Sequence, residues 1–264
     1  MGSIRLAIHL WSLAARSRMQ YRLNLVFQCL GMFLTTAADF LALWALLRLC
    51  GSGLGWSLPE AALLYGTVNT AFGLAQVVNG GIEQVPGLIQ RGELDLILLR
   101  PRPPLLLIAT RDLPLRQFGR MGQGALVLAW AIWSLPAMHH PAALALIGWA
   151  MVGGLGLYLA LSLLQSAACF WTVENLEVWN VLTYGGNMAA QWPQELYRPT
   201  LRWVLLTVLP VAAVGWLPVS EALGRAHGFP SWVAWLAPLM ALPLLAAAWG
   251  LWCLGLRRYA STGS

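Results

Sequence analysis

The sequence predicts an all-α integral membrane protein with six transmembrane helices in a single domain, and three features of its composition support this fold class. Of its 264 residues, 59% are hydrophobic and only 10% are charged, whereas about 25% of the residues in soluble proteins are charged. The chain contains fifteen tryptophans, and its mean hydropathy is +0.66. Six spans of about 20 residues would use roughly 120 residues, which leaves room for loops but none for a second catalytic domain.

The first predicted element is an amphipathic helix over residues 3–22. Its polar side chains recur every three or four residues and therefore share one helical face: Arg5, His9, Ser12, Arg16 and Gln20. A basic amphipathic helix suits the headgroup layer of an anionic membrane leaflet. The alternative is an ordinary surface helix that packs on the rest of its own domain.

Six apolar stretches follow, and we expect the spans at residues 23–49, 59–81, 119–135, 142–170, 203–219 and 231–256. The first stretch is longer than the hydrophobic region of a signal peptide, so we expect it to be retained as a span. Two polar segments, 82–118 and 171–201, separate pairs of spans. Glutamates and arginines interrupt the second segment too often for a span, so we expect it to be a cytoplasmic segment.

The arginines are distributed unevenly over the expected topology. Fourteen of the sixteen lie in segments that face the cytoplasm if the N-terminus is inside, and only Arg48 and Arg225 lie outside. Short cytoplasmic loops are rich in basic residues, so the count places both termini in the cytoplasm. Membrane topology thus explains the formal net charge of +6, and we expect no nucleic-acid partner. No internal repeat indicates an inverted-repeat secondary transporter.

The sequence lacks the usual motifs of intramembrane enzymes. It has no HExxH or GxSxG string and no pair of carboxylates within a span. All sixteen basic residues are arginine, which excludes a lysine-based phosphate loop and a serine–lysine dyad. His139 and His140 are adjacent in a turn, where they suit a metal site poorly, and we interpret them as a polar interfacial turn. We expect no catalytic residue and no metal site on this chain.

Polar and small residues within the spans are the next candidates for function. Asp39 is the one acidic residue deep in a span, so it should face the bundle interior, a water-filled path or a partner chain. Small residues recur every four positions on two spans: Ala62, Gly66 and Thr70 on the second, and Ala150, Gly154, Tyr158, Ser162 and Ser166 on the fourth. Such stripes allow helices to pack closely or line a cavity, and we favour packing.

Residues 83–101, with the sequence EQVPGLIQRGELDLILLRP, combine apolar anchors with charges of both signs. This pattern predicts a short amphipathic helix at the membrane surface with a docking face toward the cytosol. The alternative is a loop that joins two spans, but a plain connector would not need so many apolar residues.

This segment also carries a resemblance to a known family, the six-span permease subunits of type-2 ATP-binding-cassette (ABC) exporters, in the branch with two different permeases and one ATPase. The similar strings occur in the family's order: GWSLPE (55–60), LYG (64–66), RGELDL (91–96) and LLRP (98–101). Weaker matches follow in the second half: FWTV (170–173), PVA (210–212) and Pro218. Residues 187–199 keep only part of the family's aromatic–proline pattern.

The resemblance implies a division of labour between chains. A separate ATPase would bind ATP and Mg²⁺ on the cytoplasmic side, and this chain would bind no cofactor. The helix around residues 91–100 would be the coupling helix that seats in the ATPase, with Leu94, Leu96 and Leu98 as its anchors. The residues carried over as its contacts are Arg91, Gly92, Glu93, Leu94, Asp95, Leu98, Arg100 and Pro101.

The resemblance also implies a second, non-identical permease, which would enclose the translocation path together with this chain in the bacterial plasma membrane. The candidates for lining the path are Asp39, Asn69 and Tyr158. Two other classes of function stay open from the residues alone: a secondary transporter or channel that works by itself, and a non-transporting scaffold or membrane enzyme. A neighbouring gene for a nucleotide-binding subunit would favour the exporter.

Overall fold

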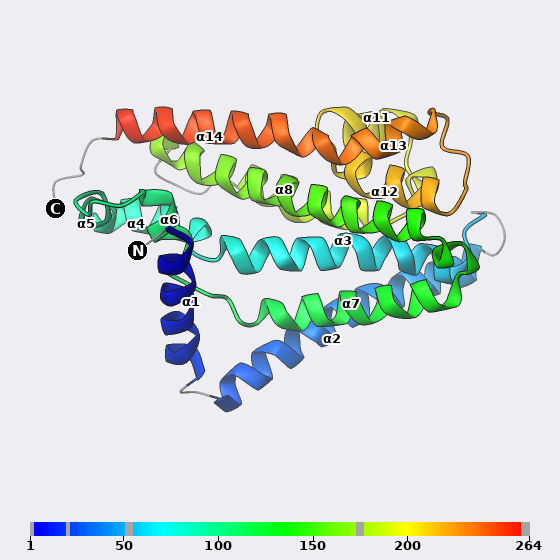
Figure 1. The fold of residues 1–264 in the computed structure, drawn as a ribbon, viewed down its shortest axis with the longest axis horizontal. Helices are drawn as coiled ribbons and strands as arrows, with labels where there is room; N and C mark the ends of the chain where they lie inside the picture. The colour runs from blue at the N-terminus through cyan, green and yellow to red at the C-terminus, as the bar shows by residue number, and fades with distance from the viewer. Residues whose placement is uncertain (1–2, 20–21, 51–54, 173–176, 260–264) are drawn as a thin grey trace.

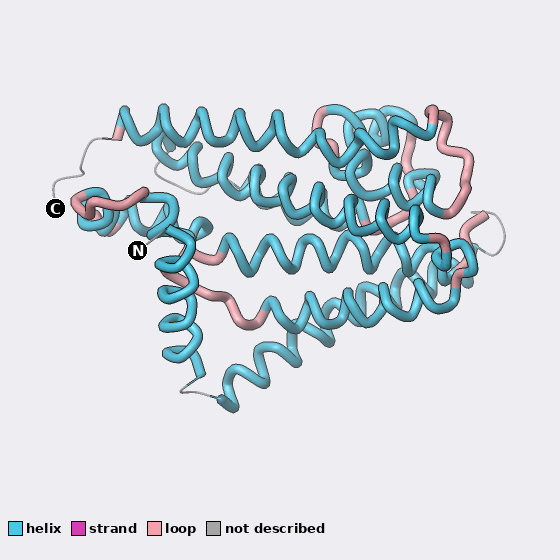
Figure 2. The backbone as a smooth tube through the Cα atoms, in the orientation of Figure 1, coloured by secondary structure: helices cyan, strands magenta, loops and turns pink. Residues whose placement is uncertain are grey.

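The computed structural model describes residues 3–19, 22–50, 55–172 and 177–259, and every regular element in these ranges is helical (Figure 1, Figure 2). The predicted all-α class is confirmed. The long helices are α1 (Ser3–Met19), α2 (Arg22–Cys50), α3 (Leu58–Asn79), α7 (Gln117–Ser134), α8 (Pro141–Thr172) and α14 (Ala241–Arg258).

Short elements occupy the two ends of the bundle and part of its interior. The short α-helices are α4 (Val85–Gln90), α5 (Glu93–Leu98), α6 (Pro104–Ala109), α9 (Glu177–Asn180), α10 (Gly186–Ala190), α11 (Pro199–Thr207), α12 (Val211–Ala222) and α13 (Ser231–Leu236). Single turns join them: η2 (Ile82–Gln84), η3 (Pro136–His139), η4 (Val181–Gly185), η5 (Gln194–Leu196) and η6 (Ala237–Met240).

The long helices α2, α3, α7, α8 and α14 run side by side, and the two ends of this bundle differ (Figure 1). Helices α4, α5 and α6 gather at one end, which we call the coupling end, and α1 lies there across the bundle direction. Helices α11, α12 and α13 gather toward the other end, which we call the far end. On α1, His9 and Arg16 are exposed, and Gln20 of the predicted polar face lies outside the described residues.

Helix α3 is the centre of the bundle. Within its most apolar window, 83% of the residues are buried, against 17% for α2, and α7, α8 and α12 pack around it. The Ser57 amide donates to the Glu60 carboxylate at 2.7 Å, which satisfies an amide that would otherwise be orphaned at the helix start. The lower exposure of α3 explains why polar side chains are tolerated on it: they face protein, not lipid.

The small-residue stripes on α3 and α8 allow close helix packing, as the sequence predicts. A Cβ on Gly66 would lie 2.7 Å from the Leu128 amide nitrogen of α7, and one on Gly154 would lie 2.9 Å from the Ala71 methyl group. Such distances are shorter than real Cβ contacts, so only glycine permits these crossings. Close approach of backbones is the usual role of small residues between spans.

Four of the described helices are long and apolar enough to cross a membrane: α2, α3, α8 and the continuous segment Ser231–Arg258, which comprises α13, η6 and α14. A fifth is reached if the bent pair α11 and α12 counts as one span. The predicted count of six is therefore not confirmed. The predicted third span exists as α7, but Gln117, Arg120 and Gln123 lie in its first two turns and lower its hydropathy.

The predicted fifth span, 203–219, is wrong as a continuous helix. Helices α11 and α12 meet at an angle of 98°, and Pro210 lies at the break between them. Proline has no amide proton and clashes with the preceding turn, so it ends a helix. The bend packs against α10, where a Cβ on Gly186 would lie 3.0 Å from a Leu209 methyl group.

Residues 177–190 also differ from the predicted cytoplasmic segment, because they form a helical path that enters the bundle against α3. Three polar contacts fix its direction: Gln76 with Tyr184 at 3.4 Å, Tyr158 with Asn187 at 3.1 Å, and Asn69 with Gln191 at 3.3 Å. This segment therefore runs from the coupling end toward the far end, antiparallel to α3. The polar residues that indicated a loop instead face partners inside the bundle.

Candidate functional site: the coupling end and the bundle interior

The residues predicted to contact an ATPase lie on a helical hairpin at the coupling end. Helix α4 ends at Gln90 and α5 begins at Glu93. Between them Gly92 adopts a left-handed φ of 66°, a conformation that glycine reaches without steric cost. The predicted single helix is therefore two short helices with a sharp turn.

The hairpin has its own apolar core, which joins it to the ends of two long helices. Its buried members from the hairpin and α6 are Val85, Leu88, Ile89, Leu94, Ile97 and Ile108. They pack with Leu163 and Ala167 of α8 and with Trp252 of α14. The Phe170 and Trp252 rings meet edge to face at 5.1 Å, and the Ser166 hydroxyl donates to the Ile82 carbonyl at 2.7 Å. The hairpin is thus packed as one unit with α8 and α14.

Glu93 is the electrostatic centre of the hairpin. Its carboxylate accepts from the Arg91 Nε at 2.6 Å and pairs with Arg111 on the segment that leads to α7. The hydrogen bonds from Arg91 and Arg111 hold the pKa of Glu93 below its ordinary range. A second link joins the Gln84 amide to the Asp112 carboxylate at 2.7 Å. Both links tie the hairpin to the start of α7.

The predicted ATPase contacts divide into a buried base and an exposed edge. Leu94 is fully buried and Leu98 is half-buried, whereas Arg91 and Arg100 are exposed, as is Pro101 just after α5. Leu96, predicted as an anchor, is wrong in that role, because it is 65% exposed. In a helix the partners of Leu94 are three and four residues away, so residue 96 points to another face.

The sequence did not single out Leu99 of the exposed edge, whereas Asp95, which is half-buried, was predicted as a polar contact. Leu99 is 82% exposed beside Leu96, and Asp95 faces the Tyr259 hydroxyl. A groove of about 570 Å³ separates this edge from α1, with Leu10 and Leu13 on one wall. A helical-period count from Leu94 would have predicted Ile97 as an anchor in place of Leu96.

Asn69 and Tyr158, two candidates for lining the path, are both buried at the centre of the bundle. The Asn69 side chain accepts from Gln191 and donates to the Tyr65 carbonyl, and the Tyr158 hydroxyl lies 3.1 Å from the Asn187 side-chain oxygen. The cavity beside Tyr158 holds only about 10 Å³, about one water molecule. In this conformation both residues contact neighbouring side chains of the described bundle interior.

Comparison with known proteins assigns the chain to a family. A family model described as ABC-2 family transporter protein matches residues 33–263. The chain belongs to the ABC-2 transporter family. No curated protein and no solved structure matches it.

Membership of the ABC-2 family agrees with the helices that are long and apolar enough to cross a membrane, so the chain is a multi-pass membrane protein and an ABC transporter permease. Permeases of this family work in general with a separate ABC ATPase. The match begins within α2 and includes the hairpin, α7, α8 and α14.

Asp39, the third residue predicted to line the translocation path of this ABC-2 permease, is half-exposed on α2. It does not stand alone, because Arg120 of α7 is within electrostatic reach. The Arg120 guanidinium lies 5.0 Å above the Phe72 ring of α3. From the sequence, Arg120 was counted only among the cytoplasmic arginines. Its spacing from Arg116 and Gln123 places all three residues near one face of α7, and this pattern could have indicated an inward position.

Proposed function

We propose that this chain is a permease subunit of an ATP-driven ABC exporter, that it encloses a path with a second, non-identical permease, and that a separate ATPase docks on the hairpin α4–α5. The observation that supports this best is the division of the hairpin. Its base is packed on α8 and α14, and its edge presents Leu96 and Leu99 to solvent.

Exposed leucines on a small charged hairpin are typical of a docking surface. Leu96 is 65% and Leu99 82% exposed, and Arg100 is exposed next to them. Protein interfaces combine an apolar centre with a polar rim, and such a patch marks an interaction site on a monomer. ATP and Mg²⁺ would bind to the partner, since this chain carries no lysine for a phosphate loop.

The proposed topology has six crossings, with α7 as the third and a composite fifth crossing made of residues 177–190 and α12. Arg202 stacks 4.6 Å above the Trp216 ring of α12. In the proposed topology Arg198 and Arg202 are therefore counted at the far end, not at the coupling end. Twelve arginines then lie at the coupling end and four at the far end. This distribution supports a cytoplasmic location for the hairpin and both termini, and in the proposal α1 lies in the headgroup layer of the bacterial plasma membrane.

The test is retention of the ATPase by the affinity-tagged full-length chain purified from its own membranes. We expect ATPase activity in the eluate of the wild type and none in the eluate of the double variant Leu96→Arg, Leu99→Arg. Both side chains are exposed, so the variant should fold. Phe229→Arg in the loop before α13, where Phe229 is 46% exposed, is the matched control.

Unchanged ATP hydrolysis in the Leu96→Arg, Leu99→Arg eluate would disprove docking at the hairpin. An eluate of the wild type without any ATPase subunit would favour a transporter or channel that works alone.

A further inference from the structure

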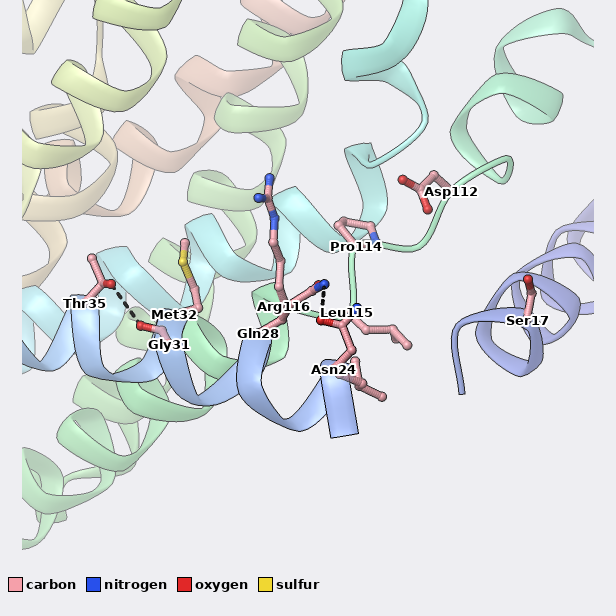
Figure 3. A pocket seen from close by; sticks show the side chains of 11 residues that line it. Ser17, Asn24, Gln28, Gly31, Met32, Thr35, Asp112, Pro114, Leu115 and Arg116 are labelled. Atoms are coloured by element: carbon pink, nitrogen blue, oxygen red, sulfur yellow. Dashed lines mark hydrogen bonds between the residues drawn. The ribbon is translucent and has the colours of Figure 1, made fainter. Parts of the chain in front are cut away.

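A polar groove lies between α1, α2 and the segment that precedes α7 (Figure 3). Its volume is about 820 Å³. The polar side chains that line it are Ser17, Asn24, Gln28, Thr35, Asp112 and Arg116. On α2 the lining residues are spaced by three and four positions, so they share one face of an otherwise apolar helix. A polar face on a membrane helix is costly unless it meets a polar partner.

The walls of this groove lead one helical turn further to two charged residues. Arg116 lines the groove, and Arg120 follows four residues later on α7. Thr35 lines the opposite wall, and Asp39 follows four residues later on α2. A contact between α2 and the segment before α7 holds this arrangement, because the Cys29 thiol donates to the Leu115 carbonyl at 3.2 Å. Arg120 and Asp39 thus lie one helical turn beyond residues that line the groove.

Arg120 lacks a hydrogen-bonding partner among the residues that the structure describes. Its Nε is inaccessible to solvent and has no acceptor, and its guanidinium is stacked on Phe72. A guanidinium has five N–H donors in one plane, and stacking leaves these donors free to point past the edge of the ring. A buried N–H donor without an acceptor is unfavourable, so this site favours a further anionic acceptor in addition to the nearby Asp39 carboxylate.

We propose that Arg116 and Arg120 bind the phosphate or carboxylate group of an amphipathic molecule that enters through this groove, and that anionic amphiphiles are the class of substrate transported. The class of substrate rests on the proposed transport function. Arginine forks bind phosphate and carboxylate in pairs of parallel hydrogen bonds. The apolar part of the ligand has a surface to follow, since α2 exposes Leu23, Val26 and Phe27 next to its polar face.

Three carboxylates lie near these arginines and set the balance of charge. Glu83 is within electrostatic reach of Arg116, and burial raises the pKa of Glu83. Asp112 accepts from Gln84. Asp39 is the carboxylate in reach of Arg120 and therefore competes with a bound anion. Removing the charge of Asp39 should strengthen anion binding.

The experiment measures lipid binding to the purified full-length chain by native mass spectrometry, with dioleoylphosphatidylglycerol as the anionic probe and dioleoylphosphatidylcholine as the zwitterionic one. We expect tighter binding of the anionic lipid by the wild type. Arg120→Gln and Arg116→Gln should each weaken it about tenfold, the loss typical of one charge-assisted hydrogen bond. Asp39→Asn should bind it more tightly. Arg48→Gln is the matched control, because Arg48 also stacks on an aromatic ring, Trp44, but at the far end of α2.

Three outcomes would overturn the proposal. Equal losses in Arg120→Gln and Arg48→Gln would show general attraction to positive charge, and equal binding of the two lipids by the wild type would show that the anion is not recognised. Displacement of the lipid by millimolar inorganic phosphate would show a free-anion site, not one for an amphiphile. Arg116 is exposed, so its variant keeps the test valid if Arg120→Gln does not fold. The assay uses no ATP, so its failure leaves the ATPase-retention test standing.

Discussion

Leu94 and Leu96, two residues apart on α5, provide the sharpest test of how the hairpin is built. Leu94 is fully buried in the core shared with α8 and α14, and Leu96 is 65% exposed. Truncation of a fully buried leucine to alanine costs about 2–5 kcal/mol. Truncation of an exposed leucine away from special features stays within about 0.5 kcal/mol. The structure therefore predicts opposite phenotypes for Leu94→Ala and Leu96→Ala.

Hydrogen–deuterium exchange of the peptides that cover residues 85–98 measures the difference. In Leu94→Ala these amides should exchange at least about thirtyfold faster, which corresponds to about 2 kcal/mol of lost protection. In Leu96→Ala their exchange should not change, but co-purification of the ATPase should fall. Equal protection in both variants, or loss of protection only in Leu96→Ala, would refute the orientation of α5.

Two further predictions concern stability. Gly66→Ala should lower the Tm, because overpacking against Leu128 costs about 1–3 kcal/mol and the better helix propensity of alanine recovers only about 1 kcal/mol. Gly122→Ala is the control and should raise the Tm, because nothing lies within 4 Å of the added Cβ. A higher Tm in both variants would contradict the close crossing. Glu93→Gln should remove a pH-dependent contribution to stability, because Arg91 and Arg111 lower the pKa of Glu93 in the folded protein. This contribution is present above the ordinary glutamate pKa of about 4.3. It is lost as the pH falls through the lower pKa of the folded state. The difference in Tm between wild type and Glu93→Gln should therefore shrink on acidification, and a constant difference would argue against these ion pairs.

The sequence was sufficient where a helix is long and uniformly apolar. The predicted spans 23–49, 59–81 and 142–170 differ by no more than two residues at each end from α2, α3 and α8. Residues 231–256 likewise correspond to Ser231–Arg258. In these stretches local hydropathy alone decides the structure, since the alternative of exposing apolar surface to water is much less favourable.

The sequence failed where a polar residue finds its partner on a distant segment. Asn187 and Gln191 lie in a stretch that is too polar for a span when considered alone, yet their partners Tyr158 and Asn69 stand on α8 and α3. A single segment does not contain that information. The same reason explains Arg120, whose neighbours Asp39 and Phe72 belong to α2 and α3.

The predicted coupling segment forms helices, but its shape depends on one residue. Gly92 was included only as part of a string that resembles the family. Its positive φ turns one predicted helix into a hairpin, and this turn changes which leucines are buried. Periodicity could not reveal this, because α5 has only six residues and gives too few positions to fix a helical face.

In the proposed transporter, movement of the hairpin would reach the rest of the bundle by two separate routes. The apolar core transmits it to α8 and α14 through Leu94 and Trp252. The pair Glu93–Arg111 transmits it to the segment that opens α7, and α7 carries Arg120. A packed core resists compression, whereas an exposed ion pair is weak and breaks readily. Displacement of α8 and α14 should therefore follow the ATPase rigidly, while the start of α7 can detach, which would allow the arginines to release a bound anion without a change in the far end of the bundle.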